Sequence, residues 1–229
     1  MFTDVYIVRH CEAFGNVTKV FQGVSDFDVT PRGQAQLDLL AERFKTVKLD
    51  AIYSSPLLRA KKTAQAINKH HNLPIKINDK LIEIDGGEIE GVCWVDFPIT
   101  RPVIEYHWLM EPHKFHVPGG EPMTNVYKRS WEAVLDIVKY NRGKSVAIAS
   151  HGCTIRNIIC RAMGKPIEEL NSVDWADNTG VYLLRFSDNE LPQIVYANDF
   201  SHLGKENIDD DTRIRRLIME KPRELEDRL

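Results

Sequence analysis

The stretch SVAIASHGCTIRNIICRAMG, residues 145–164, has the pattern of a buried strand that runs directly into a helix. Residues 145–150 form a short and almost wholly apolar run, which is typical of a strand covered on both faces. The run stops at His151-Gly152, and the helical stretch that follows ends at Gly164. A strand followed by a helix is half of the repeating unit of a parallel α/β sheet.

Two further segments repeat this pattern nearer the start of the chain. VYIVRH at 5–10 and AIYSS at 51–55 have the composition of short buried strands. The spacing of apolar residues predicts a helix that starts at Thr30-Pro31 and another that starts at Pro56. The chain therefore alternates strands and helices over its first half.

The last strands differ, because only a short turn separates them. GVYLLRF at 180–186 is followed by Ser187-Asp188-Asn189, after which QIVYA at 193–197 can return antiparallel. Together the segments predict an α/β fold, a three-layer α/β/α sandwich whose central sheet is mostly parallel with one antiparallel edge strand.

Composition sets the size and the setting of this fold. A chain of 229 residues with 43% hydrophobic residues can bury the core of one large domain. We expect residues 1–204 to form a catalytic domain and residues 205–229 a charged helical C-terminal tail. The tail has a narrow apolar stripe, so a docked helix and a helix that bridges a homodimer both remain open.

Charge and cysteine usage limit the classes of partner. A net charge of −3 with mixed signs provides no basic field for nucleic acid and no anchor for a membrane. The start, MFTDVYIVRH, fits neither a signal peptide nor a membrane span, so we expect a cytoplasmic protein. The four cysteines, at positions 11, 93, 153 and 160, have no CxxC spacing, which favours reduced thiols.

Residues able to bind phosphate follow three of the predicted strands. Arg9 and His10 end the first strand, Arg59 lies one helical turn after the second, and His151 follows SVAIAS. Ligands of open α/β sheets bind beyond the carboxyl ends of the strands. We therefore expect these four side chains to lie close together.

Their chemistry suits attack on a phosphomonoester. A neutral imidazole is a nucleophile near physiological pH, and arginine neutralises phosphate oxygens two at a time. Free amides after His151-Gly152 would add positive charge, and a protonated His151 could donate to the phosphoryl group. The leaving alcohol needs a proton, for which Glu83 in LIEIDGGEIEG is the best candidate; its competitors are Asp85, Glu88 and Glu90.

Five motifs in this order resemble the histidine phosphatase superfamily, which also contains the phosphoglycerate mutases. They are RHCEAFGN with FQG at 9–23, SSPLLRAKKTA at 54–64, LIEIDGGEIEG at 81–91, PGGE at 118–121 and SHGCTIR at 150–156. Five ordered matches are far more specific than a single RHxE motif.

This resemblance assigns roles to individual residues. His10 would be the phosphorylated histidine, Arg9, Arg59 and His151 the rest of the phosphate pocket, and Glu83 the proton donor. Asn16 and Gln22 would lie at the substrate edge, and the glycines that follow Gln22 and His151, Gly23 and Gly152, would also line the site. Cys11 and Cys153 stand where the family usually has glycine, and Val20 where it often has arginine.

Hydrolysis of a small phosphorylated metabolite is our preferred function, with no metal and no cofactor. Mutases typically follow the acidic residue with arginine, histidine and tyrosine, which Ile84-Asp85-Gly86 does not supply. Mutase-type phosphoryl transfer remains the second hypothesis. A metal site formed by His10, His151 and Glu83, and a phosphate-binding scaffold without turnover, are two further alternatives; the arginines argue against the metal.

The segment at about 92–120 is too long and too irregular for a simple connection, so we expect it to be a lid-like insertion over the pocket. It is rich in aromatic and basic residues, namely Trp94, Arg101, His107, Trp108, His113, Lys114 and His116. The aromatic residues could form ordinary core and the basic residues a solvated face, or both could contact the substrate. The sequence does not favour substrate contact over the first alternative.

Overall fold

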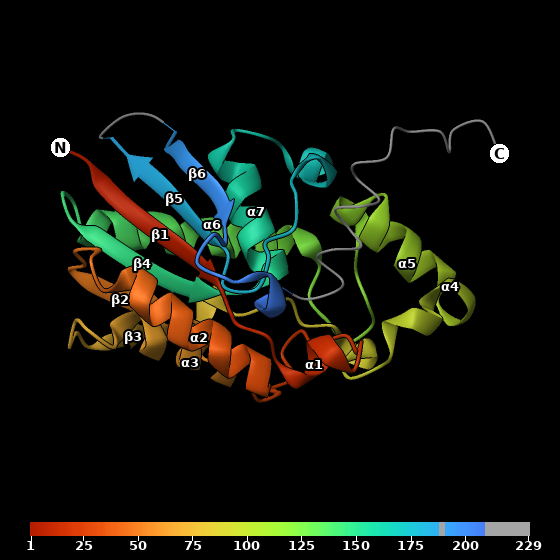
Figure 1. The fold of residues 1–229 in the computed structure, drawn as a ribbon. Coiled ribbons are helices and arrows are strands. Elements are labelled where there is room, and N and C mark those ends of the chain that lie inside the picture. Colours follow the sequence, from red (N-terminus) through yellow and green to blue (C-terminus); the bar gives the residue numbers. More distant parts are fainter. Residues whose placement is uncertain (188–190, 209–229) are drawn as a thin grey trace.

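A computed structural model describes residues 1–187 and 191–208. One six-stranded sheet runs through the molecule in the order β3-β2-β4-β1-β5-β6 (Figure 1). Its strands are β1 (Thr3–Arg9), β2 (Ala51–Ser54), β3 (Ile75–Ile77), β4 (Ser145–Ser150), β5 (Val181–Phe186) and β6 (Gln193–Asp199).

Helices and short 3-10 turns connect the strands. The α-helices are α1 (Phe14–Val17), α2 (Pro31–Phe44), α3 (Leu58–Asn68), α4 (Phe97–Thr100), α5 (Pro102–Leu109), α6 (Met123–Tyr140) and α7 (Gly152–Ala162). The 3-10 turns are η1 (Asp79–Leu81), η2 (Gly87–Ile89), η3 (Trp94–Asp96), η4 (Pro112–Lys114), η5 (Ile167–Ser172) and η6 (Lys205–Asn207).

The sheet separates two hydrophobic cores, because successive side chains of a strand point to opposite faces. Val5 and Ile7 of β1 belong to the core that includes buried residues of α6 and α7. The side chain of Val8 points to the opposite face of the sheet and belongs to the core that includes residues of α2 and α3. Figure 1 shows these two helix pairs on opposite sides of the sheet. The predicted three-layer α/β/α fold is confirmed.

Most of the predicted boundaries hold. The side chain of Thr30 accepts a hydrogen bond from the Gly33 amide and caps α2, a contact that stabilises a helix by about 1 kcal/mol. Gly164 adopts a φ of +71° just beyond α7, as expected of a residue that ends a helix. The helix predicted from Pro56 begins two residues later, at Leu58, whose amide donates to the Asp26 carboxylate.

The strand directions refine the prediction at the end of the sheet. β1, β2, β3 and β4 are parallel, and β5 is antiparallel to both β1 and β6. The antiparallel strand is therefore β5, one place in from the edge, and β6 forms the edge. The hairpin predicted between residues 180 and 197 accounts for this order, because a hairpin always reverses the chain.

The segment at 92–120, which we expect to be a lid-like insertion, has more regular structure than a loop, since it contains η3, α4, α5 and η4. In Figure 1 its two helices lie at the end of the molecule opposite the N-terminus. Of the predicted tail, residues 205–208 are described and begin with η6; the helix predicted beyond them lies outside the described residues. Among the described residues, no helix is both long and apolar enough to cross a membrane.

Candidate active site

Three neighbouring parallel strands end side by side and carry the candidate residues. Arg9 of β1 pairs with Ser150 of β4, so His10 and His151 follow at adjacent strand ends. β2 lies on the other side of β4, with Ser54 opposite Ala149. The centroids of the His10 and His151 rings are 5.3 Å apart. The parallel sheet thus brings together residues that are far apart in sequence.

The hydrogen bonds of His10 determine which ring nitrogen is free. Its Nδ1 lies 2.6 Å from the carbonyl oxygen of Cys11. A carbonyl can only accept, so Nδ1 carries the hydrogen and Nε2 keeps its lone pair. The side chain is buried, and burial, followed by the charges of Arg59 and Arg9, holds the pKa of His10 well below its ordinary value. His10 therefore presents a neutral, nucleophilic Nε2 near pH 7.

His151 is equally buried, and its Nε2 lies 2.7 Å from the hydroxyl oxygen of Ser55. Burial, and after it the charge of Arg59 and the proximity of His10, hold the pKa of His151 well below its ordinary value. A protonated His151, which we expected as a donor, is thus disfavoured in the ligand-free protein. In the ligand-free protein the ring of His151 is therefore neutral near pH 7.

Arg59 joins the pocket to the loop at 22–25. Its two terminal nitrogens donate to the carbonyl oxygens of Gln22, Gly23 and Ser25 at 2.7–3.2 Å. Its Nε is buried and has no hydrogen-bond partner among the described residues. Burial lowers the pKa of Arg59 to about 10, although the charge of Glu83 partly offsets this effect. Arg59 therefore remains a cation near pH 7, and its Nε–H is among the donors left for a ligand.

Arg9 and Gly152 lie next to each other across β1 and β4. Arg9 donates to the carbonyl oxygen of Ala176 at 2.6 Å. A Cβ atom built on Gly152 would lie 3.4 Å from Nε of Arg9 and 3.5 Å from the ring of Trp175. Because Gly152 has no side chain, the backbone at the start of α7 lies close to the guanidinium group of Arg9.

Glu83 is fixed at the start of α7. Its Oε1 accepts from the amides of Ile84 and Thr154, both at 3.0 Å, and contacts the Thr154 hydroxyl. Among the described residues its Oε2 accepts one hydrogen bond, from the Cys153 amide at 2.9 Å. Oε2 therefore keeps a lone pair for a proton, while Oε1 anchors the carboxylate.

The expectation that the amides at the start of α7 are free for phosphate is wrong for two of them. Those of Cys153 and Thr154 donate to Glu83, because a carboxylate is a favourable partner for a helix N-terminus. Among the described residues only the Gly152 amide of this first turn is left without a partner.

The predicted substrate-edge residues have structural contacts of their own. Asn16 accepts from the Ala13 amide through its side chain and so closes the first turn of α1. The Oε1 atom of Gln22 is buried and has no partner among the described residues, and the side chain packs against Gly15. Gly23 is where the 22–25 loop contacts the backbone at Ile84.

Several residues that shape the site have no role assigned from the sequence, although Ser54-Ser55 is expected at the end of the second strand. Ser55 contacts His151, and Arg129 of α6 donates to the carbonyl oxygens of Ile82 and Glu83. Glu90, considered only as a competitor of Glu83, accepts from the amides of Val24 and Gly86 and holds two loops together. The position of Ser55 in SSPLLRA, directly after a strand, was the signal available in the sequence.

An aromatic cluster joins the insertion to the site. The ring of Trp108 in α5 lies 5.4 Å from Phe21, 4.8 Å from Phe115 and 5.5 Å from Trp175, measured between centroids. Trp175 in turn contacts Gly152 and lies under the guanidinium group of Arg156. The insertion thus packs on a residue that borders the phosphate pocket.

The two cysteines that replace glycine are buried side chains. Burial raises the pKa of Cys11 to about 12 and that of Cys153 well above its ordinary value. Neither is a thiolate near pH 7, so both act as small apolar groups.

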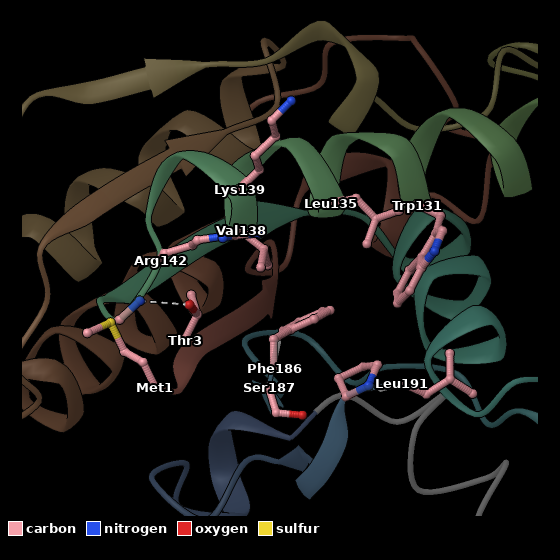
Figure 2. Close-up of a pocket in the computed structure, with 12 residues that line it drawn as sticks. Met1, Thr3, Trp131, Leu135, Val138, Lys139, Arg142, Phe186, Ser187 and Leu191 are labelled. Carbon is pink, nitrogen blue, oxygen red and sulfur yellow. Dashed lines mark hydrogen bonds between the residues drawn. The ribbon is translucent and has the colours of Figure 1, made fainter. Parts of the chain in front are cut away.

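Two features of the described residues lie outside this site. Among the described residues, no group of three or more histidine, cysteine, aspartate or glutamate side chains is placed to hold a metal ion. The alternative metal site formed by His10, His151 and Glu83 therefore has no support from the geometry. A cavity of about 680 Å³ opens between α6 and the start of β1 (Figure 2). It is lined by Thr3 at the start of β1 and by Phe186 at the end of β5, whereas His10 follows the other end of β1. None of the predicted site residues reaches it.

Comparison with known proteins gives one consistent result. The model of the histidine phosphatase superfamily, branch 1, matches residues 5–199. Phosphoserine phosphatase 1 of Hydrogenobacter thermophilus is 32% identical over 199 residues, which cover 87% of this chain and 93% of that protein.

Solved structures agree with the sequence comparison. Bacillus stearothermophilus YhfR superposes with a TM-score of 0.82 at 30% identity, over 87% of this chain and 98% of that one. A phosphoserine phosphatase mutant of Entamoeba histolytica, solved in complex with phosphoserine, has a TM-score of 0.77 at 26% identity and covers 88% and 99%. The chain belongs to the histidine phosphatase superfamily, branch 1, and is a phosphoric monoester hydrolase.

Proposed function

We propose that this protein hydrolyses a small phosphomonoester, with phosphoserine as the first substrate to test, through a phosphohistidine formed on His10. One observation carries the mechanism. The hydrogen bond from Nδ1 of His10 to the Cys11 carbonyl leaves a neutral Nε2 as a nucleophile inside a pocket lined by arginines.

In the first half of the reaction, Nε2 of His10 attacks phosphorus, and the bond from phosphorus to the leaving oxygen breaks. Arg9 and Arg59 stabilise the charge on the phosphoryl oxygens. Glu83 enters this step as the carboxylic acid and gives its proton from Oε2 to the leaving alkoxide, becoming the carboxylate. Oε2 suits this role because it accepts only one other hydrogen bond among the described residues.

The second half regenerates the enzyme. The Glu83 carboxylate takes a proton from water, the water oxygen bonds to phosphorus, and the bond from phosphorus to Nε2 breaks. Inorganic phosphate leaves, and both His10 and Glu83 return to their starting states. Every proton and electron pair is accounted for without a metal, and two guanidinium groups in the pocket would repel a divalent cation.

The choice of substrate and of hydrolysis rests on two kinds of support. One relative is named a phosphoserine phosphatase, and the Entamoeba enzyme was solved with phosphoserine bound. Against a mutase, Ile84-Asp85-Gly86 provides no cation to retain a phosphorylated acid for the return transfer, and the Asp85 side chain accepts from the Gly87 amide.

A cytoplasmic location is part of the proposal. The four cysteines are free and three of them are buried, which fits a reducing compartment. A homodimer bridged by the C-terminal tail stays one of two open hypotheses, beside a tail that docks on its own domain.

Phosphate release from a panel of phosphomonoesters in EDTA tests the proposal, with wild type, His10→Ala and His70→Ala side by side. His70 is a histidine beyond the end of α3 that contacts Glu42 and serves as the matched control. We expect release in EDTA by wild type and by His70→Ala, and a loss of at least 1,000-fold in His10→Ala. Release that needs a metal, or that survives in His10→Ala, would refute the mechanism.

A further inference from the structure

Ser55 and His151 follow the ends of the adjacent strands β2 and β4, and their side chains form a hydrogen bond. Ser55 follows β2 and its amide donates to the Ala149 carbonyl, which fixes it beside the end of β4. Its hydroxyl oxygen is 2.7 Å from Nε2 of His151, and both residues are 0% exposed. This contact is therefore shielded from water and fully determined by the protein.

The hydrogen of the Ser55 hydroxyl has one available acceptor. The other contact of this oxygen among the described residues is with the Leu57 amide, which is itself a donor, at 3.4 Å. If His151 donated from Nε2, the hydroxyl hydrogen would be buried without an acceptor, at a cost of a buried unsatisfied donor. In that arrangement Nδ1 of the ring would lack a partner as well, whereas donation from Ser55 to Nε2 leaves Nδ1 as the one unpartnered group of the pair among the described residues.

The other ring nitrogen then carries the proton. Nδ1 of His151 is buried and has no hydrogen-bond partner among the described residues. With Nε2 occupied by the Ser55 hydroxyl, a neutral ring must hold its hydrogen at Nδ1. Burial, and after it the charge of Arg59, hold the pKa of His151 well below its ordinary value, so the neutral ring is the form to consider in the ligand-free protein.

We propose that Ser55 is a positioning residue that fixes the tautomer of His151, so that a neutral imidazole presents an Nδ1–H donor to the phosphoryl oxygens. This inference rests on the proposed function for the identity of the acceptor. The tautomer itself is a property of the ligand-free protein, and it can be measured without any turnover.

Side-chain ¹⁵N chemical shifts of histidine-labelled protein at pH 7.5 provide that measurement. Spectra of His151→Asn and His10→Asn assign the two rings. We expect His151 in wild type to be protonated at Nδ1 and unprotonated at Nε2. A ring protonated at Nε2, or at both nitrogens, would overturn the inference whether or not the enzyme is active.

Kinetics of Ser55→Ala test the consequence for turnover. Without the hydroxyl the ring loses the contact that selects its tautomer, and we expect kcat to fall about 10- to 100-fold with little change in KM. Ser54→Ala is the matched control, because Ser54 is equally buried and its hydroxyl donates to the Ser55 carbonyl rather than to His151.

The outcomes separate this inference from the proposed function. Unchanged kcat in Ser55→Ala, with His10→Ala inactive, would reject the role of Ser55 and leave the phosphatase intact. Wild type without any phosphatase activity would reject the proposed function, and the ¹⁵N shifts would still decide the tautomer. If Ser55→Ala does not fold, the shifts of the wild-type protein remain decisive.

Discussion

Gly23 is a residue at which two loops of the active site come into close contact. A Cβ atom built on it would lie 2.0 Å from the Ile84 carbonyl oxygen and 2.2 Å from Oε1 of Glu90. The Gly23 carbonyl accepts from Arg59, and Ile84 directly follows Glu83. The absence of a side chain at Gly23 thus sets the spacing between the arginine and the acid.

Gly23→Ala should therefore damage both stability and catalysis. The new methyl group must push apart two backbone segments, and overpacking of this kind costs about 1–3 kcal/mol. We expect the melting temperature to fall by about 2–12 °C, and kcat to fall at least tenfold in the protein that remains folded. Differential scanning fluorimetry and phosphate release on the same sample measure the two effects.

Gly204→Ala serves as the control for this substitution. The Cβ atom built there meets only the flexible carboxylate of Glu206, and its φ of −66° suits alanine. A Gly23→Ala enzyme with the kcat and melting temperature of Gly204→Ala would show that the loop spacing has no importance.

Individual residues also show which parts of the site could be predicted from the sequence. His10 and His151 could be placed together from sequence because both follow apolar strand-like runs, and parallel strands end at one edge. The contacts of Arg59 could not, since its acceptors are main-chain carbonyls whose positions no side chain reveals. The occupied amides at the start of α7 are a similar case.

At the element scale, α6 holds the acid in place through Arg129. The guanidinium group forms a bidentate ion pair with Glu121, with both contacts at 2.7–2.8 Å. It also donates to the carbonyl oxygens of Lys80, Ile82 and Glu83. One side chain thus ties η1 and the Glu83 backbone to a long helix.

We expect Arg129→Met to lower kcat at least tenfold and to cost about 3 kcal/mol of stability. The stability loss arises because Glu121 keeps a partly buried charge without its partner. The double variant Arg129→Met/Glu121→Gln removes that charge. It should recover part of the stability but none of the kcat, because the tether to Glu83 is still missing.

Urea unfolding and kinetics of the single and double variants distinguish these two effects. Arg142→Met is the control, since this exposed arginine just beyond α6 forms no ion pair among the described residues. Recovery of kcat together with stability in the double variant would contradict the positioning role.

The elements also differ in how far sequence could predict them. The strands β1, β2, β4 and β5 are apolar runs with clear ends, and all were predicted. β3 has three residues, two of them exposed, and joins the sheet only by pairing with β2. α4 and α5 have a similar problem: no residue of α5 is buried, so they lack the one-sided pattern that marks a surface helix.

At the scale of the whole molecule, the fold keeps neutral histidines next to arginines in its interior. Burial and Arg43 lower the pKa of His202 to about 4, and the pKa values of His10 and His151 are also well below the ordinary value of 6.5. Above pH 6.5, these rings are neutral in both the folded and the unfolded chain, so they do not change the free energy of unfolding. Below pH 6.5, these histidines bind protons in the unfolded chain but not in the folded chain, so the free energy of unfolding falls.

We therefore expect the free energy of unfolding to decrease from pH 6.5 to about pH 4, by up to about 1.4 kcal/mol per pH unit for each such histidine. Urea unfolding at several pH values measures the slope, and His202→Gln tests it away from the active site. Nδ1 of His202 lies beside Arg43 and Nε2 beside the Thr179 hydroxyl, contacts that a neutral amide can replace. The variant should have a shallower slope than wild type, whereas replacement of the exposed His116 by asparagine should not. Parallel slopes for wild type and His202→Gln would mean that this ring binds its proton equally well in the folded and unfolded chain.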